Sequence, residues 1–184
     1  RKESSAASDV YKRQGLMPSS AGQVFFLGEP VIKPRKEIGY MLQRDQLFEW
    51  RSILRNTLLG PEIQHSSHKD KRKARKTASE MLTRYDLGGF LGAKPSELSG
   101  GMRQRAALIR TLVLDPDLLL LDEPFSALDY QTRLNVGDDI GQIIRQEGKS
   151  AVLVTHDLSE AISLADRIIV LSGRPANIRQ TVPL

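Results

Sequence analysis

The run Leu-Leu-Leu-Leu-Asp-Glu-Pro at residues 118–124 limits, more than any other stretch, what this chain can fold into. Consecutive apolar residues without alternation are typical of a strand buried on both faces, as in a parallel sheet covered by helices. Pro124 prevents the strand from continuing, so Asp122 and Glu123 stand where it ends. Chemistry in open α/β sheets lies at that edge, where two carboxylates can hold Mg²⁺ and activate a water beside a phosphate. On these residues alone, a solvated acidic turn is the alternative.

Other strands and helices are expected from the same kinds of pattern. The expected strands are 24–27, 38–42, 151–155 and 167–171. Strand 151–155 is expected to be buried, and 167–171 is expected to be the final strand of the chain. The expected helices are 52–59, 69–86, 102–114, 130–147 and 158–165. Gly88-Gly89 is expected to cap the helix that ends at 86, and Gly148 the one that ends at 147. This alternation predicts an α/β fold, and the helical stretch from 52 to 113 resembles an inserted helical subdomain.

Composition fits one domain of ordinary polarity. The 184 residues include 40% hydrophobic and 27% charged residues, and no apolar run approaches the roughly 18 residues of a membrane span. There is no cysteine and hence no disulfide. Much of the net charge of +5 lies on one expected helix, at 69–76. A solvated helix face is the favoured explanation, with nucleic acid or lipid binding as the alternative.

A few segments and residues stand apart from the rest. Residues 1–14 are polar and non-periodic and lack the apolar core of a signal peptide. We expect them to be non-native and to lie outside a partial domain at 15–184. His65 and His68 have no ligand-type partners at metal-binding spacing, so they are expected at the surface. Trp50 is expected either to pack in the helical subdomain or to meet a membrane subunit.

A second group of residues, Leu-Ser-Gly-Gly-Met-Arg-Gln-Arg at 98–105, opens an expected helix. The first N–H groups of a helix have no intrahelical partner and lie at the positive end of its dipole. Gly100 and Gly101 allow an anion to approach the backbone, and the Ser99 hydroxyl adds a donor. These residues are therefore suited to bind a phosphate. The alternative is a simple helix N-cap, which such sequences usually form.

Taken together, five motifs resemble those of the ATP-binding cassette (ABC) ATPases. Residues 98–105 resemble their signature sequence, 118–124 their Walker B strand and 126–129 their D-loop. Residues 155–157 resemble their switch-histidine loop, and Gln43 resembles their Q-loop glutamine. The motifs occur in the family's order across roughly 15–184. The resemblance implies a P-loop NTPase-like, mainly parallel sheet with flanking helices, and an inserted helical subdomain at about 44–113.

The resemblance implies a role for each residue at the end of these strands. Asp122 would bind Mg²⁺, and Glu123 would be the general base that polarises the attacking water. Gln43 would contact both Mg²⁺ and that water. His156 would contact the γ-phosphate of ATP.

The same resemblance implies a head-to-tail homodimer with ATP held between two subunits. Ser99, Gly100 and Gly101 would bind the γ-phosphate of ATP held by the other subunit. Asp129 would order that opposing subunit.

The sequence departs from the family in one respect. The family requires a phosphate loop of the form G-x-x-x-x-G-K-[ST], whose lysine and backbone cradle the β- and γ-phosphates. The full pattern does not occur in these 184 residues, because the one Gly-Lys-Ser, at 148–150, has Ile143 where the first glycine should stand. We therefore expect an N-terminally truncated reading frame, with an early C-terminus as well, that neither binds ATP tightly nor hydrolyses it, although the parent protein does.

Segments 47–60, 122–129 and 171–175 resemble ATPases of nitrate, sulfonate and taurine importers. The implied function is ATP hydrolysis that powers uptake of a small solute. The implied partners are a transmembrane permease and, indirectly, a substrate-binding protein, with no nucleic acid, at the cytoplasmic face of a bacterial membrane. Two alternatives stay open. One is a DNA-repair or chromosome-type ABC ATPase, disfavoured because Gln43 and Leu98 are only 55 positions apart. The other is a silent regulatory or binding module.

Overall fold

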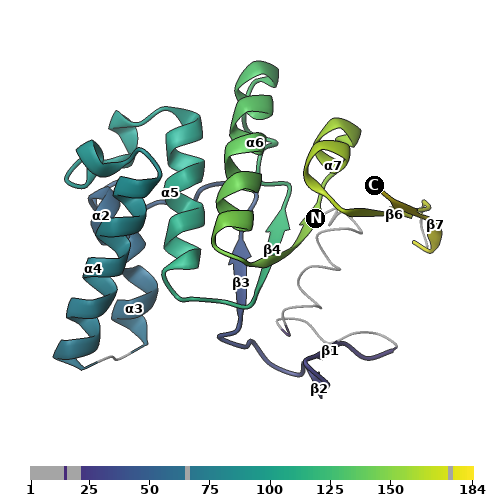
Figure 1. Ribbon diagram of the computed structural model, residues 1–184, viewed down its shortest axis with the longest axis horizontal. Coiled ribbons are helices and arrows are strands. Elements are labelled where there is room, and N and C mark those ends of the chain that lie inside the picture. The colour runs from purple at the N-terminus through teal and green to yellow at the C-terminus, as the bar shows by residue number, and fades with distance from the viewer. Residues whose placement is uncertain (1–14, 16–21, 65–66, 174–175) are drawn as a thin grey trace.

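A three-stranded parallel sheet lies at the centre of the computed structural model, which describes residues 15, 22–64, 67–173 and 176–184 (Figure 1). Its strands, in the order β3-β4-β5, are β3 (Ile38–Met41), β4 (Leu118–Asp122) and β5 (Ser150–Val154). Met41 aligns with Leu121, and Asp122 with Val154, so all three strands end at one edge. The predicted α/β fold with a parallel sheet is confirmed. Residues 1–14 lie outside the described residues.

The expected double-sided burial of the Walker B-like strand is confirmed. In β4, Leu119 and Leu121 belong to the main hydrophobic core, whereas Leu120 points to the other face and is equally buried. Each of the three is at most 3% exposed. Alternate side chains of a strand point to opposite faces, so both faces of β4 are covered.

The prediction that residues 151–155 form a buried strand is wrong in its burial. β5 does form, but Ala151 is exposed and the residues from Val152 to Val154 are only half-buried. Among the described residues β5 pairs only with β4. It is therefore an edge strand, and the apolar pattern of 151–155 could not distinguish an edge from a central position.

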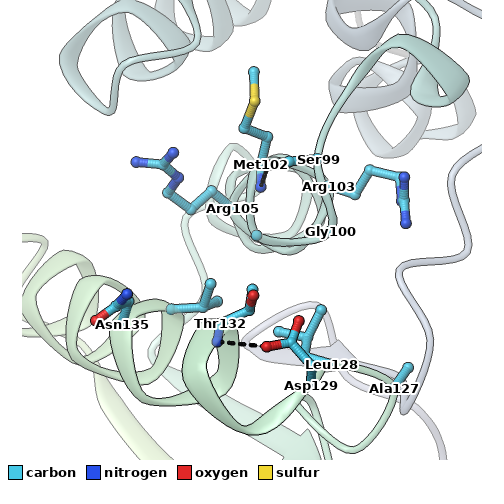
Figure 2. Close-up of a pocket in the computed structure, with 12 residues that line it drawn as sticks. Ser99, Gly100, Met102, Arg103, Arg105, Ala127, Leu128, Asp129, Thr132 and Asn135 are labelled. Carbon is cyan, nitrogen blue, oxygen red and sulfur yellow. Dashed lines mark hydrogen bonds between the residues drawn. The ribbon is translucent and has the colours of Figure 1, made fainter.

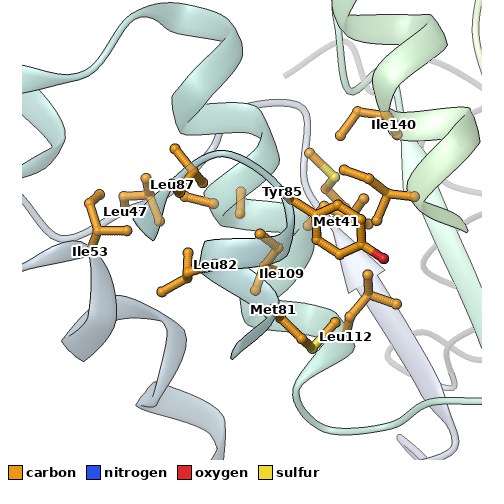
Figure 3. Packing of buried hydrophobic residues seen from close by; sticks show 14 of the residues in the cluster. Met41, Leu47, Ile53, Met81, Leu82, Tyr85, Leu87, Ile109, Leu112 and Ile140 are labelled. Atoms are coloured by element: carbon orange, nitrogen blue, oxygen red, sulfur yellow. The ribbon is translucent and has the colours of Figure 1, made fainter. Parts of the chain in front are cut away.

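Helices α5 (Gly100–Leu112) and α6 (Tyr130–Gln146) lie on one face of the sheet (Figure 1). The remaining helices among the described residues are α2 (Ile53–Thr57), α3 (Leu59–Ile63), α4 (His68–Arg84), α7 (Leu158–Leu164) and the 3₁₀ turns η1 (Gly88–Phe90) and η2 (Pro95–Glu97). A hydrophobic core of described residues runs from Ile53 and Leu82 through Ile109 to Met41 and Ile140 (Figure 3). Helices α2 and α4 thus share a core with the sheet, and a helical subdomain with bounds at 44 and 113 stays a prediction.

Two details of the predicted helices are wrong. Residues 52–59 do not form one helix, because α2 ends at Thr57 and α3 begins at Leu59. Pro61 has no N–H to donate to the carbonyl of Thr57, so a continuous helix would lack that bond. In α6, the spacing of Leu134, Ile140, Ile143 and Ile144 predicts one buried apolar face, but Leu134 is 39% exposed.

The glycine pair at 88–89 does not cap α4. Asp86 takes the left-handed conformation instead, with a φ of 63°, and the N–H of Leu87 donates to the carbonyl of Leu82 at 2.7 Å. Aspartate tolerates this conformation better than most residues. Gly148, by contrast, has a φ of 64° directly after the α6 cap, as predicted.

Strands at the two ends of the chain form separate antiparallel pairs. β1 (Phe25–Phe26) pairs with β2 (Glu29–Pro30), and β6 (Arg167–Leu171) pairs with β7 (Ile178–Pro183). The sequence prediction that 167–171 is the final strand is therefore wrong. β7 is mostly exposed and has Arg179, Gln180 and Thr181 at its centre, so it carries little apolar signal. No helix among the described residues is long and apolar enough to span a membrane.

Candidate functional site

Three side chains predicted from the motifs meet at the carboxyl edge of the sheet. Gln43 follows β3, Glu123 follows β4 and His156 follows β5. The Gln43 amide Nε2 donates to Glu123 Oε2 at 3.2 Å. Nδ1 of His156 lies 3.2 Å from Glu123 Oε1. Each carboxylate oxygen of Glu123 thus has its own neighbour, and the carboxylate is oriented from both sides.

The backbone at Glu123 is strained. Its φ is 44°, a left-handed conformation that is unfavourable for a residue with a Cβ. The backbone N–H of Glu123 donates to the carbonyl of Val154 at 2.8 Å, and its own carbonyl accepts from the Ser126 hydroxyl at 3.0 Å. Such strain persists where the surroundings fix the backbone, and it is concentrated at functional sites.

Asp122 lies beside this cluster but deeper, with 8% of its surface exposed. The Tyr40 hydroxyl donates to Asp122 Oδ2 at 3.3 Å. Burial raises the pKa of Asp122 above its ordinary value; the Tyr40 hydrogen bond lowers it, and the charge of Glu123 raises it further. A bound cation would favour the ionised form of this carboxylate.

The oxygen donors at this edge fit Mg²⁺ in kind but not in number. Mg²⁺ prefers carboxylate, carbonyl and water oxygens, and it usually keeps several waters and substrate phosphates. Asp122 supplies a carboxylate and Gln43 an amide oxygen. The described residues contain no group of three or more histidine, cysteine or acidic side chains that could hold a metal unaided. A cation here would depend on phosphate oxygens and water for its other ligands.

A second site lies where the start of α5 faces the start of α6. A pocket of about 410 Å³ is bordered there by Ser99, Gly100, Gly101 and Asp129 (Figure 2). Its lining also includes Met102, Arg103, Arg105, Ala127, Leu128, Thr132, Asn135 and Val136. The arginines and the α5 N-terminus make this pocket suitable for an anion.

Ser99 and Asp129 each cap the helix that they precede. The Ser99 hydroxyl accepts from the N–H of Met102 at 3.3 Å, and Asp129 Oδ1 accepts from the N–H of Thr132 at 3.0 Å. The hydrogen bonds from Thr132 hold the pKa of Asp129 below its ordinary value. The helix-cap alternative for Ser99 is therefore realised, and it is compatible with anion binding by the rest of the pocket.

Close packing favours glycine at both positions at the start of α5, most strongly at Gly101. A Cβ on Gly101 would lie 2.5 Å from Val136 Cγ2, and one on Gly100 would lie 2.8 Å from Leu128 Cδ2. Both distances are shorter than real Cβ contacts. The two glycines thus let α5 approach α6 and the loop before it, whatever their role toward a ligand.

The predicted site residues fall into two separate groups. The pocket of Ser99 and Asp129 has neither Gln43 nor Glu123 nor His156 in its lining. A ligand in this pocket and a ligand at the sheet edge would therefore be held by different parts of the surface.

The outlying predictions have mixed outcomes. His68 is exposed as expected, and His65 lies outside the described residues. The basic residues of α4 at 69–76 are exposed, in agreement with a solvated face. Trp50 is 73% exposed and stacks on Phe48 with ring centroids 4.7 Å apart. Of its two predicted alternatives, packing inside the helical subdomain is therefore wrong, and contact with a membrane subunit stays a prediction.

The motif analysis missed two residues that bond to the site. Tyr40 lies in the predicted strand 38–42, and its hydroxyl near the end of that strand, beside another strand that ends in a carboxylate, is a usable signal. Arg133 lies in the first turn of α6, and its side chain joins the Asp129 loop to the His156 loop. An arginine on an amphipathic helix carries no sequence signal for such a contact.

Comparison with known proteins gives one consistent result. A family model described as "ABC transporter" matches residues 14–126. An uncharacterized ABC transporter ATP-binding protein, YtlC, of Bacillus subtilis is 46% identical over 171 residues, which are 92% of this chain and 65% of that protein. A taurine import ATP-binding protein, TauB, of Pseudomonas fluorescens is 41% identical over 92% of this chain and 63% of its own length. The chain thus spans less than two thirds of the length of these relatives.

Solved structures agree on the fold. The dimeric post-hydrolysis state of an ATP-binding cassette bound to ADP and Pi superposes with a TM-score of 0.71 at 24% identity, over 97% of this chain and 81% of that chain. CbiO1 from Clostridium perfringens, described as part of an ABC transporter complex, gives 0.76 at 22% identity, over 91% of this chain and 70% of that chain.

Proposed function

Because this chain belongs to the ABC transporter family, we propose that it carries the hydrolytic and signature parts of an ATPase that powers an importer. The observation that carries the proposal is the cluster of Gln43, Glu123 and His156 on the sheet edge, next to the buried Asp122. In the proposed reaction a water oxygen attacks the γ-phosphorus of ATP, and the bond to the ADP oxygen breaks. Phosphate and ADP are the products.

In this reaction Glu123 takes the proton of the attacking water. Its carboxylate is already oriented by Gln43 and His156, each 3.2 Å away. A general base of this kind contributes about 10²–10⁴ in rate, or roughly 3–5 kcal/mol of barrier. His156, with 70% of its side chain exposed, is free to reach a γ-phosphate. Asp122 and Gln43 would hold Mg²⁺, which neutralises phosphate charge when it is bound.

The pocket bordered by Ser99, Gly100, Gly101 and Asp129, here called the signature pocket, contacts ATP held by a second copy of the chain. We assign Ser99, Gly100, Gly101 and Asp129 to the ATP of the partner in a head-to-tail homodimer. This assignment is supported by the separation of their pocket from Glu123 and His156. It is also supported by the dimeric form of one solved relative.

The importer role rests on the relatives. Proteins named as taurine import ATP-binding proteins are 40–41% identical to this chain, so a taurine-like or other small anionic solute is the proposed cargo. The proposed partners are a membrane permease, met through the helical subdomain at 44–113, and indirectly a substrate-binding protein. The proposed place is the cytoplasmic face of the bacterial membrane, as a peripheral subunit.

We further propose that these 184 residues alone do not hydrolyse ATP. No phosphate loop with its lysine occurs in their sequence, and such a loop provides the backbone donors and the cation for the β- and γ-phosphates. Glu123 and His156 would then act only beside a phosphate loop from elsewhere.

A fusion protein tests the function. The phosphate-loop segment of the Pseudomonas fluorescens relative is joined ahead of residues 22–184, and Mg-ATP turnover is measured for this fusion and for the isolated chain. We expect the fusion to turn over at about 1 s⁻¹ or faster and the isolated chain to show none.

The matched variant is Glu123→Gln in the fusion, which keeps size and hydrogen bonding but removes the base. A loss of roughly 10²-fold or more supports the proposal. Turnover that survives Glu123→Gln would refute the role of Glu123. Turnover by the isolated chain that the same substitution abolishes would refute its inactivity.

A further inference from the structure

Arg133 joins two loops that the proposed reaction uses separately. We propose that Arg133 is a positioning residue: it ties the loop that carries His156 to the loop that carries Asp129, and so holds the His156 ring against Glu123. The catalytic meaning of this link rests on the proposed function, whereas the link itself is a property of the chain without nucleotide.

The guanidinium of Arg133 makes contacts in two directions. Nη1 donates to Asp157 Oδ2 at 3.1 Å, and Nη2 donates to the backbone carbonyl of Leu128 at 3.1 Å. Nε lies 3.8 Å from Glu160 Oε1. The side chain is only 21% exposed, so these contacts are partly shielded from water. A planar guanidinium can bond two groups in fixed directions, which a lysine ammonium cannot do equally well.

On one side, the contact reaches the residue that follows His156. Asp157 caps α7, because its Oδ1 accepts from the N–H of Ser159 at 2.8 Å. Its other oxygen, Oδ2, bonds Arg133. The N–H of Asp157 donates to the Thr155 hydroxyl at 3.0 Å, and that hydroxyl donates to Glu160 Oε2 at 2.6 Å. The residues on both sides of His156 are therefore fixed, although its own ring is 70% exposed.

On the other side, the contact reaches the residue before Asp129. The carbonyl of Leu128 accepts from Arg133 Nη2, and the carbonyl of Asp129 accepts from the backbone N–H of Arg133 at 2.9 Å. Leu128 also borders the signature pocket. A displacement of the Asp129 loop would thus be transmitted through one side chain to the His156 loop.

The ring signals of His156 report this link directly. The chain has only 3 histidines, so long-range ¹H–¹⁵N spectra of the full chain resolve the ring nitrogens, and His156→Gln assigns them. Glu123→Gln gives the shift that marks loss of the ring's charged neighbour. We expect Arg133→Gln to move the His156 nitrogens in the same direction by roughly half of that shift or more, and to add nothing further in the Glu123→Gln background.

Two further variants separate positioning from general stability. Asp157→Asn keeps a side chain able to cap α7 but loses the ion pair, so it should reproduce the shift even if Arg133→Gln folds poorly. Arg145→Gln removes an exposed arginine from the last turn of the same helix and should leave His156 unmoved. Arg133→Lys keeps the positive charge, so it should move the His156 signals less than Arg133→Gln does.

Unmoved His156 signals in both Arg133→Gln and Asp157→Asn, while Glu123→Gln moves them, would overturn the proposal. Unmoved signals in Glu123→Gln would overturn it as well, since the ring would then not lie against that carboxylate. Because no nucleotide is present, a lack of ATP turnover in the fusion protein would leave these outcomes unchanged.

Discussion

Substituting Gly101 by alanine tests how closely the signature helix packs on α6. The new Cβ would lie 2.5 Å from Val136 Cγ2. Val136 is 5% exposed, and a β-branched residue in a helix has one strongly preferred rotamer, so its methyl group has little freedom to turn away. The clash must be relieved by separating α5 from α6 at the signature pocket.

The magnitude follows from two opposing terms. Overpacking of this kind costs about 1–3 kcal/mol, whereas alanine gains up to about 1 kcal/mol over glycine in a helix. We expect a net loss of about 1–2 kcal/mol, equivalent to a fall in Tm of roughly 2–8 °C for a chain of this size.

Urea unfolding followed by circular dichroism measures the loss. Gly137→Ala is the matched control on the facing helix, because its Cβ would meet only Leu164 Cδ1 at 3.9 Å; it should be neutral or stabilising. Combined with Val136→Ala, the Gly101→Ala change should cost less than it does alone, by about 1 kcal/mol. A Gly101→Ala chain as stable as the parent, or strict additivity with Val136→Ala, would refute the packing argument.

Two further predictions concern stability. Asn56→Ala should cost about 2–4 kcal/mol in urea unfolding, because the buried Asn56 amide accepts from the N–H of Phe48 at 2.7 Å and donates to nearby carbonyls; a loss below about 1 kcal/mol would contradict this reasoning. For pH, hydrogen bonds from Ser159 and Thr132 hold the pKa values of Asp157 and Asp129, respectively, below the ordinary 3.8. Their stabilisation is present above that value and is lost as pH falls through the lower folded values, so Tm should drop below about pH 4 and less steeply in Asp157→Asn.

The central strand could be predicted because an unbroken run of apolar residues is typical of a strand buried on both faces. Four leucines before two carboxylates leave little choice for β4, and the structure buries both faces. The same reasoning failed for β5, since an edge strand of this sheet is as apolar in sequence as a central one. β7 was missed for the opposite reason: it pairs with β6, and a segment with three polar residues at its centre does not reveal that pairing.

The helix ends depend on single residues, which the periodic pattern of apolar residues does not identify. The pattern assigned the end of α4 to the glycine pair at 88–89, but Asp86 adopts the left-handed conformation two residues earlier. The break between α2 and α3 follows from the missing N–H of Pro61, a signal that was present in the sequence and not used.

At the site, the resemblance grouped the residues that the structure brings together at the sheet edge. Gln43, Glu123 and His156 come from segments far apart in the chain, and no local pattern places them within hydrogen-bond distance. What the motifs could not supply were the contacts that hold them. For Tyr40 on Asp122 the sequence offers only a hydroxyl near a strand end, and the contact of Arg133 with Asp157 depends on tertiary packing alone.

The central claim is that Glu123 of one subunit works with Ser99 of the other. Mixing two fusion proteins tests it: one carries Glu123→Gln, and the other carries Ser99→Asp, which keeps a helix-capping side chain but adds a charge that repels phosphate. Each alone should be inactive. Mixed at equal concentration, they should regain about a quarter of the parent ATPase activity, since random pairing makes half of the dimers mixed and each mixed dimer has one intact site. A mixture as inactive as its components would contradict the account, because the two residues would then serve the same chain.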